Sequence, residues 1–190
     1  MEISIKLTCK KKQNKVMIFD TSVIIELLHA NILDKLNNYR NSTDHNIEFI
    51  LTDVVFEELR KGKRVEKIES LLKQIFEIYE TPTKIMNKIS SRKLALGPGE
   101  LSVLAIATLI KQRNPSLSIT VIMDDKKGRK AAKELGLEVH GTLWIIIQLK
   151  KEKIISKEEA IRIVNELPYR GFHLDKEILD QIIKKINIDC

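Results

Sequence analysis

The most constraining feature of this sequence is the alternation of short apolar runs with amphipathic helical segments. The apolar runs predict strands at residues 16–19, 48–51, 77–80, 118–123 and 137–140. The periodic segments between and after them predict helices at about 21–29, 31–40, 53–62, 65–75, 82–94, 100–112, 126–136 and 141–152. Strand and helix in alternation are typical of a parallel sheet covered by helices on both faces. The sequence therefore predicts an α/β fold with a central, mostly parallel sheet.

The chain of 190 residues is long enough for one hydrophobic core, and its 43% hydrophobic and 31% charged residues fit a folded protein. We expect a single domain over residues 16–155, preceded by an N-terminal extension of unknown structure at 1–15. From 156 to 190 the pattern predicts a helical tail packed on the same domain, starting with the capping box "SKEE". Only two cysteines are present, Cys9 and Cys190, so a disulfide framework is not expected.

The apolar runs are too short to cross a bilayer, and the first residues lack a signal-peptide core. We therefore expect a cytoplasmic protein without a membrane anchor. The formal net charge of +7 favours a polyanionic partner through attraction to phosphates.

Acidic residues follow two of the predicted strands directly. Asp20 follows the strand at 16–19, and the pair Asp124 and Asp125 follows the strand at 118–123. In an open parallel sheet, the functional crevice lies beyond the carboxyl ends of the strands. Asp20 and Asp124 are therefore predicted to reach the same edge, although Asp124 and Asp125 could equally be a helix cap.

Two glutamates lie on apolar helix faces. Glu58 shares the face of Val54 and Val55, whereas Glu57 is predicted to face solvent. Glu100 opens its helix on or beside the packed stripe, where the amide dipoles favour an anion. A carboxylate on a buried face is costly unless a cation or a metal ion accompanies it. Alternatively, each glutamate could sit at the rim of its apolar stripe and extend to water.

Four acids, Asp20, Glu58, Glu100 and Asp124, are thus predicted to point at one crevice. Like charges this close shift one another's pKa, and a divalent cation relieves the repulsion. Because the donors are oxygens, with no His or Cys nearby, the expected ion is Mg²⁺ or Mn²⁺. Such an ion can orient a water and neutralise charge on a phosphodiester, so the acids predict a metal-dependent nuclease.

Several segments together resemble the PIN-domain family, in particular a prokaryotic branch akin to VapC-type toxins. They are "IFDTSVI", "VVFEEL", "GPGELSVLAIA" and "IMDDKKGRKAAKELGLEVHGTLWIIIQLKKEKII", and "GFHL" resembles the tail of that branch. The resemblance implies a Rossmann-like, three-layer α/β/α fold, a Mg²⁺ or Mn²⁺ centre and cleavage of single-stranded RNA that leaves a 5′-phosphate. In such toxins it also implies a homodimer that is neutralised by a small antitoxin protein.

Matched residue by residue, the resemblance assigns Asp20, Glu58, Glu100 and Asp124 as the first to fourth catalytic acids. Of these, Asp20, Glu100 and Asp124 would hold the metal. Thr21 or Ser22 matches the hydroxyl that supports the first acid. The sequence departs from the usual toxin pattern in two respects: the third acid is Glu where toxins usually have Asp, and the fourth block has a doubled acid followed by "KKGR".

Residues near the fourth acid have more than one interpretation. Asp125 could share the metal-binding role of Asp124, and Thr142 could support these acids or cap the following helix. Lys126, Lys127 and Arg129 could grip substrate phosphates or could form a solvated face.

Two other functions compete with the nuclease. A catalytically silent PIN fold could act as an RNA-binding or partner-binding module. A magnesium phosphohydrolase of the haloacid-dehalogenase type would use Asp20 as nucleophile, but that chemistry needs a second Asp two positions later, where Ser22 stands. The phosphohydrolase therefore ranks last.

Overall fold

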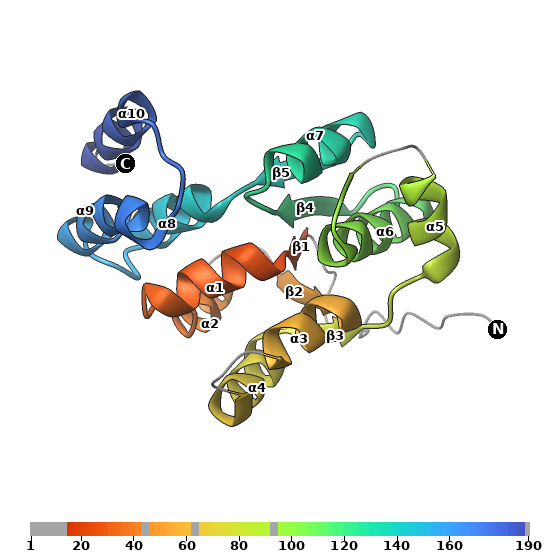
Figure 1. The fold of residues 1–190 in the computed structure, drawn as a ribbon. Helices are drawn as coiled ribbons and strands as arrows, with labels where there is room; N and C mark the ends of the chain where they lie inside the picture. The colour runs from red at the N-terminus through yellow and green to blue at the C-terminus, as the bar shows by residue number, and fades with distance from the viewer. Residues whose placement is uncertain (1–14, 43–45, 62–64, 92–94, 189–190) are drawn as a thin grey trace.

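The computed structural model describes residues 15–42, 46–61, 65–91 and 95–188, and these residues form an α/β fold (Figure 1). Within them, five strands form one sheet in the order β3-β2-β1-β4-β5, and each neighbouring pair is parallel. The strands are β1 (Lys15–Phe19), β2 (Ile47–Thr52), β3 (Glu77–Tyr79), β4 (Ser118–Ile122) and β5 (Glu138–His140). The predicted parallel sheet is confirmed. Apart from Lys15, the predicted N-terminal extension lies outside the described residues.

Helices cover both faces of this sheet and complete a three-layer fold. Figure 1 shows α1, α2 and α8 on one side of the strands and α5 and α6 on the other. The helices are α1 (Thr21–His29), α2 (Lys35–Ser42), α3 (Asp53–Arg60), α4 (Val65–Ile75), α5 (Thr83–Ser90), α6 (Pro98–Arg113), α7 (Lys126–Glu134), α8 (Thr142–Lys151), α9 (Lys157–Glu166), the 3₁₀ turn η1 (Leu167–Arg170) and α10 (Lys176–Asn187).

The central strand β1 lies where the order of the sheet reverses. The chain adds β2 and β3 on one side of β1, then returns to add β4 and β5 on the other. β1 and β4 run side by side, with Phe19 opposite Ile122 at their carboxyl ends. In open α/β sheets, ligands bind at such a switch point. The residues that follow Phe19 and Ile122 therefore lie where a site is expected.

The strands form because their side chains are buried on both faces. Val16, Met17, Ile18 and Phe19 are fully buried, as apolar runs of parallel sheets require. Phe19 also packs edge-on against Phe49 of β2, with ring centroids 5.5 Å apart. This rigid core holds the carboxyl ends of β1 and β2 in place.

The last part of the described chain is helical. α9 packs on α8, and α10 packs on both α8 and α9 (Figure 1). Ser156 caps α9 by accepting a hydrogen bond from the amide of Glu159 at 3.0 Å, as the capping-box pattern predicts. No helix in the described part of the chain is long and apolar enough to span a membrane.

Some helix ends differ from their predicted positions. The helix expected at 31–40 starts only at Lys35, because Asn31 adopts a left-handed conformation with φ of 56° and the chain turns there. Conversely, α6 starts at Pro98 rather than at Glu100, since a proline fits the first turn of a helix.

Candidate functional site

Asp20 lies at the carboxyl end of the central strand and is 5% exposed. It is itself the N-cap of α1, ahead of Thr21 and Ser22, which are residue types that also favour this position. The reason is that its Oδ2 accepts hydrogen bonds from the Ser22 hydroxyl at 2.7 Å and from the Ser22 amide at 3.4 Å. Burial raises the pKa of Asp20, and the negative charge of Glu58 raises it further.

Glu58 is half-buried on α3, whereas the neighbouring Glu57 is exposed. This is the difference that the apolar face of the helix predicts. The Thr21 hydroxyl donates to Oε2 of Glu58 at 2.5 Å and so joins the start of α1 to the last turn of α3. Thr21 and Ser22 thus serve different acids: Ser22 holds Asp20, and Thr21 holds Glu58.

Glu100 lies in the first turn of α6 and is half-buried. Its Oε2 accepts a hydrogen bond from the Gly97 amide at 2.6 Å, which caps the helix. Burial raises the pKa of Glu100, and the charges of Asp125, Asp20 and Glu58 add to that effect in this order. Carboxylates from four elements therefore act on one another electrostatically.

A buried pair of hydroxyls holds α3 and α6 together. Thr52 and Ser102 are both fully buried, and their hydroxyl oxygens are 2.7 Å apart. The Ser102 hydroxyl also lies 2.6 Å from the Gly99 carbonyl oxygen, and Thr52 accepts from the amide of Val55 at 3.0 Å. These contacts set the start of α6, which carries Glu100, against the start of α3, the helix that carries Glu58 in its last turn.

Asp124 and Asp125 differ in their hydrogen-bond partners. Asp124 accepts hydrogen bonds from the Thr142 amide at 2.9 Å and from the Thr142 hydroxyl at 2.6 Å. Asp125 instead caps α7, accepting from the Gly128 amide at 2.8 Å. Burial raises the pKa of Asp124, although the Thr142 hydrogen bonds and the Arg129 charge act in the opposite direction. Thr142 therefore supports Asp124, and the capping interpretation fits Asp125.

The three cations after this pair are not equivalent. Lys126 and Lys127 are exposed, and Arg129 is half-buried beside Asp124. Gly141 is packed against both Asp124 and Arg129, because a Cβ atom added at Gly141 would meet Asp124 Oδ1 and Arg129 Nη1. Arg129 thus stabilises the charge of Asp124, and a substrate-binding role of Lys126, Lys127 and Arg129 stays a prediction.

Glu26 of α1 is an acid at this site that sequence reasoning missed. Burial raises the pKa of Glu26, and the negative charge of Asp124 raises it further. The charges of His29 and Arg170 act in the opposite direction. Its Oε2 is buried without a hydrogen-bond partner among the described residues. The signal was present in the sequence, because Glu26 is the lone charged residue in the apolar segment "VIIELL". The same signal identified Glu58.

The chemistry of these donors fits a hard divalent cation. The donors are carboxylate oxygens, and Asp20, Glu100 and Asp124 have raised pKa values, so the hydrogen bonds and charges of the protein compensate only part of the cost of their burial. In the described part of the chain, no three His, Cys, Asp or Glu side chains stand close enough together to hold an ion in their present positions. The residues that would hold one are the predicted ligands, Asp20, Glu100 and Asp124.

Comparisons with known proteins identify the family of this chain. A family model described as a PIN domain matches residues 16–188. Among solved structures, the chain is similar to the PIN domain endonuclease Utp24, with 17% sequence identity and a TM-score of 0.46 over 68% of this chain and 86% of that chain. No curated protein matches the sequence. Because the family model covers nearly the whole described chain, from the first strand to the last helix, the protein belongs to the PIN-domain family.

Proposed function

We propose that this protein is a divalent-metal-dependent endoribonuclease that cleaves single-stranded RNA. The observation that carries the proposal is the set of acids at the switch point of the sheet. Four acids from separate parts of the chain interact electrostatically here, and their negative charges raise the pKa of Glu100 or Asp20. They are Asp20, Glu58, Glu100 and Asp125, and Asp124 lies next to Asp125 in the sequence. A cation at a phosphodiester-cleaving site would balance the negative charge that these acids gather at this edge of the sheet.

The protein's own contribution is to hold the acids in fixed orientations. Ser22 orients Asp20, Thr21 orients Glu58 and Thr142 orients Asp124, each through a hydroxyl that donates to the carboxylate. Asp20, Glu100 and Asp124 would bind Mg²⁺ or Mn²⁺, and Glu58 would complete the shell of ligands or orient a water molecule. A bound cation would supply positive charge where the phosphodiester gains negative charge in the transition state. Preorganised carboxylates need no rearrangement at that moment.

The deciding experiment incubates the protein with structured and unstructured RNAs in Mn²⁺, in Mg²⁺ or in EDTA. We expect cleavage of the unstructured RNAs, with 5′-phosphate products, only when a cation is present. Salt-dependent RNA binding without any Mn²⁺-stimulated cleavage would instead identify a silent RNA-binding module. Absence of both binding and cleavage would reject the RNA-directed function.

The biological setting follows as part of the same proposal. We expect a cytoplasmic homodimer that acts as the toxin of a toxin–antitoxin pair. Sedimentation measures the oligomeric state. Growth arrest on expression, relieved by co-expression of a small adjacent reading frame, tests the toxin role.

The "GPG" turn provides a matched pair of variants for the role of Glu58. An added Cβ at Gly99 would lie 2.7 Å from Oε2 of Glu58, whereas at Gly97 the nearest atom would be 3.6 Å away. We expect Gly99→Ala to displace the Glu58 carboxylate and to lower cleavage by roughly 10- to 100-fold, because small misplacements of catalytic groups are costly. Gly97→Ala should stay within about threefold of wild type, since 3.6 Å is ordinary van der Waals contact.

Initial rates at saturating Mn²⁺ measure this effect, and circular dichroism confirms that both variants are folded. Equal activity of the two variants would mean that the position of the Glu58 carboxylate does not matter for cleavage.

A further inference from the structure

Tyr169 is the most exposed large hydrophobic side chain in the described part of the chain. Its exposed fraction is 92%, against 61% for Ile188, the next highest. A single exposed aromatic residue needs no explanation by itself. The position of Tyr169 in the fold is what makes it informative.

The backbone around Tyr169 is well anchored. Tyr169 lies in η1, between α9 and α10, and Leu167 at the start of that turn is fully buried. The Leu167 carbonyl accepts a hydrogen bond from the Phe172 amide at 3.2 Å. Gly171 closes the turn with φ of 89°, a conformation that favours glycine. The ring is therefore presented to solvent from an ordered turn.

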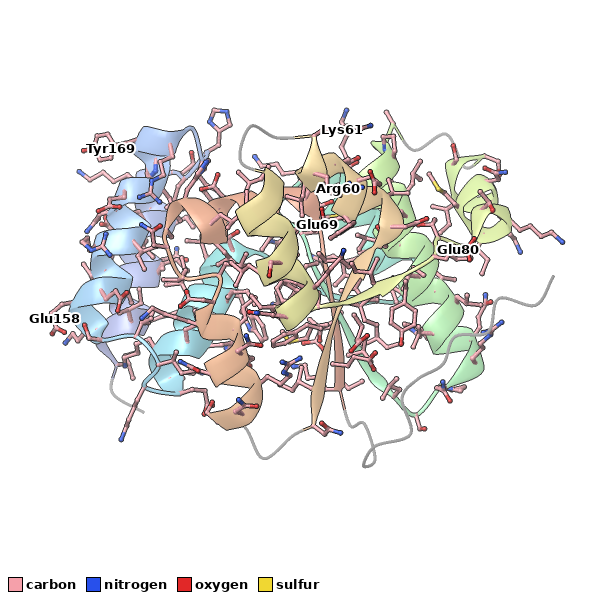
Figure 2. All side chains as sticks on the ribbon, turned by 90° about the horizontal axis from the view of Figure 1, so that it is seen from below. Arg60, Lys61, Glu69, Glu80, Glu158 and Tyr169 are labelled. Carbon is pink, nitrogen blue, oxygen red and sulfur yellow. The ribbon has the colours of Figure 1, made fainter. Side chains whose placement is uncertain are left out.

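This turn lies at the same edge of the sheet as the acids. Glu26 interacts electrostatically both with Asp124 and with Arg170, the residue that follows Tyr169. Figure 2 shows Tyr169 toward the same edge of the molecule as Arg60 and Lys61, which follow Glu58 at the end of α3. The tail thus brings an exposed aromatic ring to the side where the strands end.

Two arginines lie in this part of the tail. Arg162 and Arg170 both pair with Glu166, at 2.9 Å and 2.6 Å, and Arg170 also interacts with the charge of Glu26. The two positive and two negative charges balance, but the arginine side chains are still 55% and 26% exposed, so they can contact a ligand. Arg170 and Gly171 beside the ring are exposed, so the ring does not belong to a broad apolar surface of the kind that docks a protein.

An isolated aromatic ring beside arginines is the combination that single-stranded nucleic acids recognise. Every base can stack on such a ring, and the arginines attract the backbone. Building on the proposed ribonuclease function, we propose that Tyr169 stacks on a base of the single-stranded RNA substrate. The phosphates next to that base would then lie along the edge of the sheet that holds the acids. Arg170 beside Tyr169 contacts the RNA backbone. The helical tail is then part of the substrate-binding surface.

The test measures RNA affinity separately from cleavage. Binding of a labelled, short, unstructured RNA is followed by fluorescence anisotropy in EDTA, for wild type, Tyr169→Ala and Tyr169→Phe. We expect Tyr169→Ala to raise Kd roughly tenfold, because loss of one stacked base has an effect of this order. Tyr169→Phe should stay within about twofold, since the ring is kept. Ile178→Ala, which alters an exposed apolar side chain of α10, is the matched control and should leave Kd unchanged.

A second readout reports stacking directly. In Tyr169→Trp, the new indole should lose fluorescence when unstructured RNA is added but not when duplex RNA is added, and Trp144 in wild type provides the background. Cleavage by Tyr169→Ala should show a raised KM with kcat unchanged.

The outcomes separate this inference from the proposed function. If wild type cleaves RNA, and Tyr169→Ala binds it as tightly with no quenching in Tyr169→Trp, the stacking role is overturned and the ribonuclease stands. If Tyr169→Ala changes the oligomeric state in sedimentation instead of the RNA affinity, Tyr169 is a contact between copies of the chain, and the stacking role is again overturned. If wild type neither binds nor cleaves RNA, both proposals fail.

Discussion

The Asp20→Asn variant is expected to lose RNA cleavage on the order of a thousandfold or more while remaining folded. The amide has nearly the shape of the carboxylate and keeps one oxygen that can accept from Ser22. It removes the negative charge that would bind the cation. Cleavage of unstructured RNA in Mn²⁺ measures the loss, and Asp34→Asn, a change at an exposed carboxylate, is the control that should keep full activity.

The same variant should be more stable than wild type in EDTA at neutral pH. Burial raises the pKa of Asp20 in the folded state above its ordinary value of 3.8, so the charged form destabilises the fold. This cost is absent below the unfolded pKa, grows as the pH rises between the unfolded and the folded pKa, and is complete above the folded pKa. Asparagine never carries the charge.

Thermal unfolding in EDTA across this range tests the sign. The Tm of Asp20→Asn should exceed that of wild type at neutral pH, and the difference should shrink as the pH falls toward about 3.8. Adding Mn²⁺ should raise the Tm of wild type more than that of the variant, because ligand binding stabilises the folded state. A folded Asp20→Asn protein with full cleavage activity would reject Asp20 as a member of the catalytic site.

Gly141→Ala is the second substitution with a large expected effect. A Cβ at this position would overlap Asp124 Oδ1 and would lie 2.9 Å from Arg129 Nη1. It would also stand 3.4 Å from the Met123 carbonyl oxygen, a backbone atom that cannot easily move away. Asp124 must therefore leave its hydrogen bonds with Thr142. We expect cleavage to fall about 100-fold and the free energy of unfolding to fall by about 1–3 kcal/mol.

Cleavage rates and urea unfolding measure the two effects in parallel. Gly97→Ala is again the control, since a Cβ there would make only ordinary van der Waals contact, 3.6 Å from Glu100 Oε2. Wild-type activity and stability of Gly141→Ala would show that the loop around Gly141 can rearrange without disturbing Asp124, and that its close packing has no role in the site.

Local sequence patterns predicted most of the elements. The strands predicted at 16–19 and 118–123 from their largely apolar runs are present as β1 (Lys15–Phe19) and β4 (Ser118–Ile122). Ser156 caps its helix as the capping-box pattern predicts. The exposure difference between Glu57 and Glu58 follows from helical periodicity alone. Each of these features depends on residues within a few positions of one another. For that reason a single sequence is sufficient to predict them.

The exceptions show where local patterns stop being informative. Asp20, Thr21 and Ser22 are all good capping residues, and the sequence could not rank them. Thr21 reaches Glu58, 37 positions away, and this partner exists only once α1 and α3 have packed together. The apolar neighbours of Glu26 mark it as unusual, but its interactions with Asp124 and Arg170 join distant parts of the chain and follow from the packing alone.

The type and order of the elements, the edge of the sheet that holds Asp20 and Asp124, and the oxygen-only character of the donors thus follow from the amino-acid sequence alone. Which hydroxyl donates to which acid, which of Asp124 and Asp125 caps a helix, and where the tail presents Tyr169 depend on the packing of the folded chain. These two sets of features differ in the range of the interactions behind them. Burial patterns and helix caps are encoded over a few residues, whereas hydrogen bonds and charge interactions across a site depend on how separate elements pack.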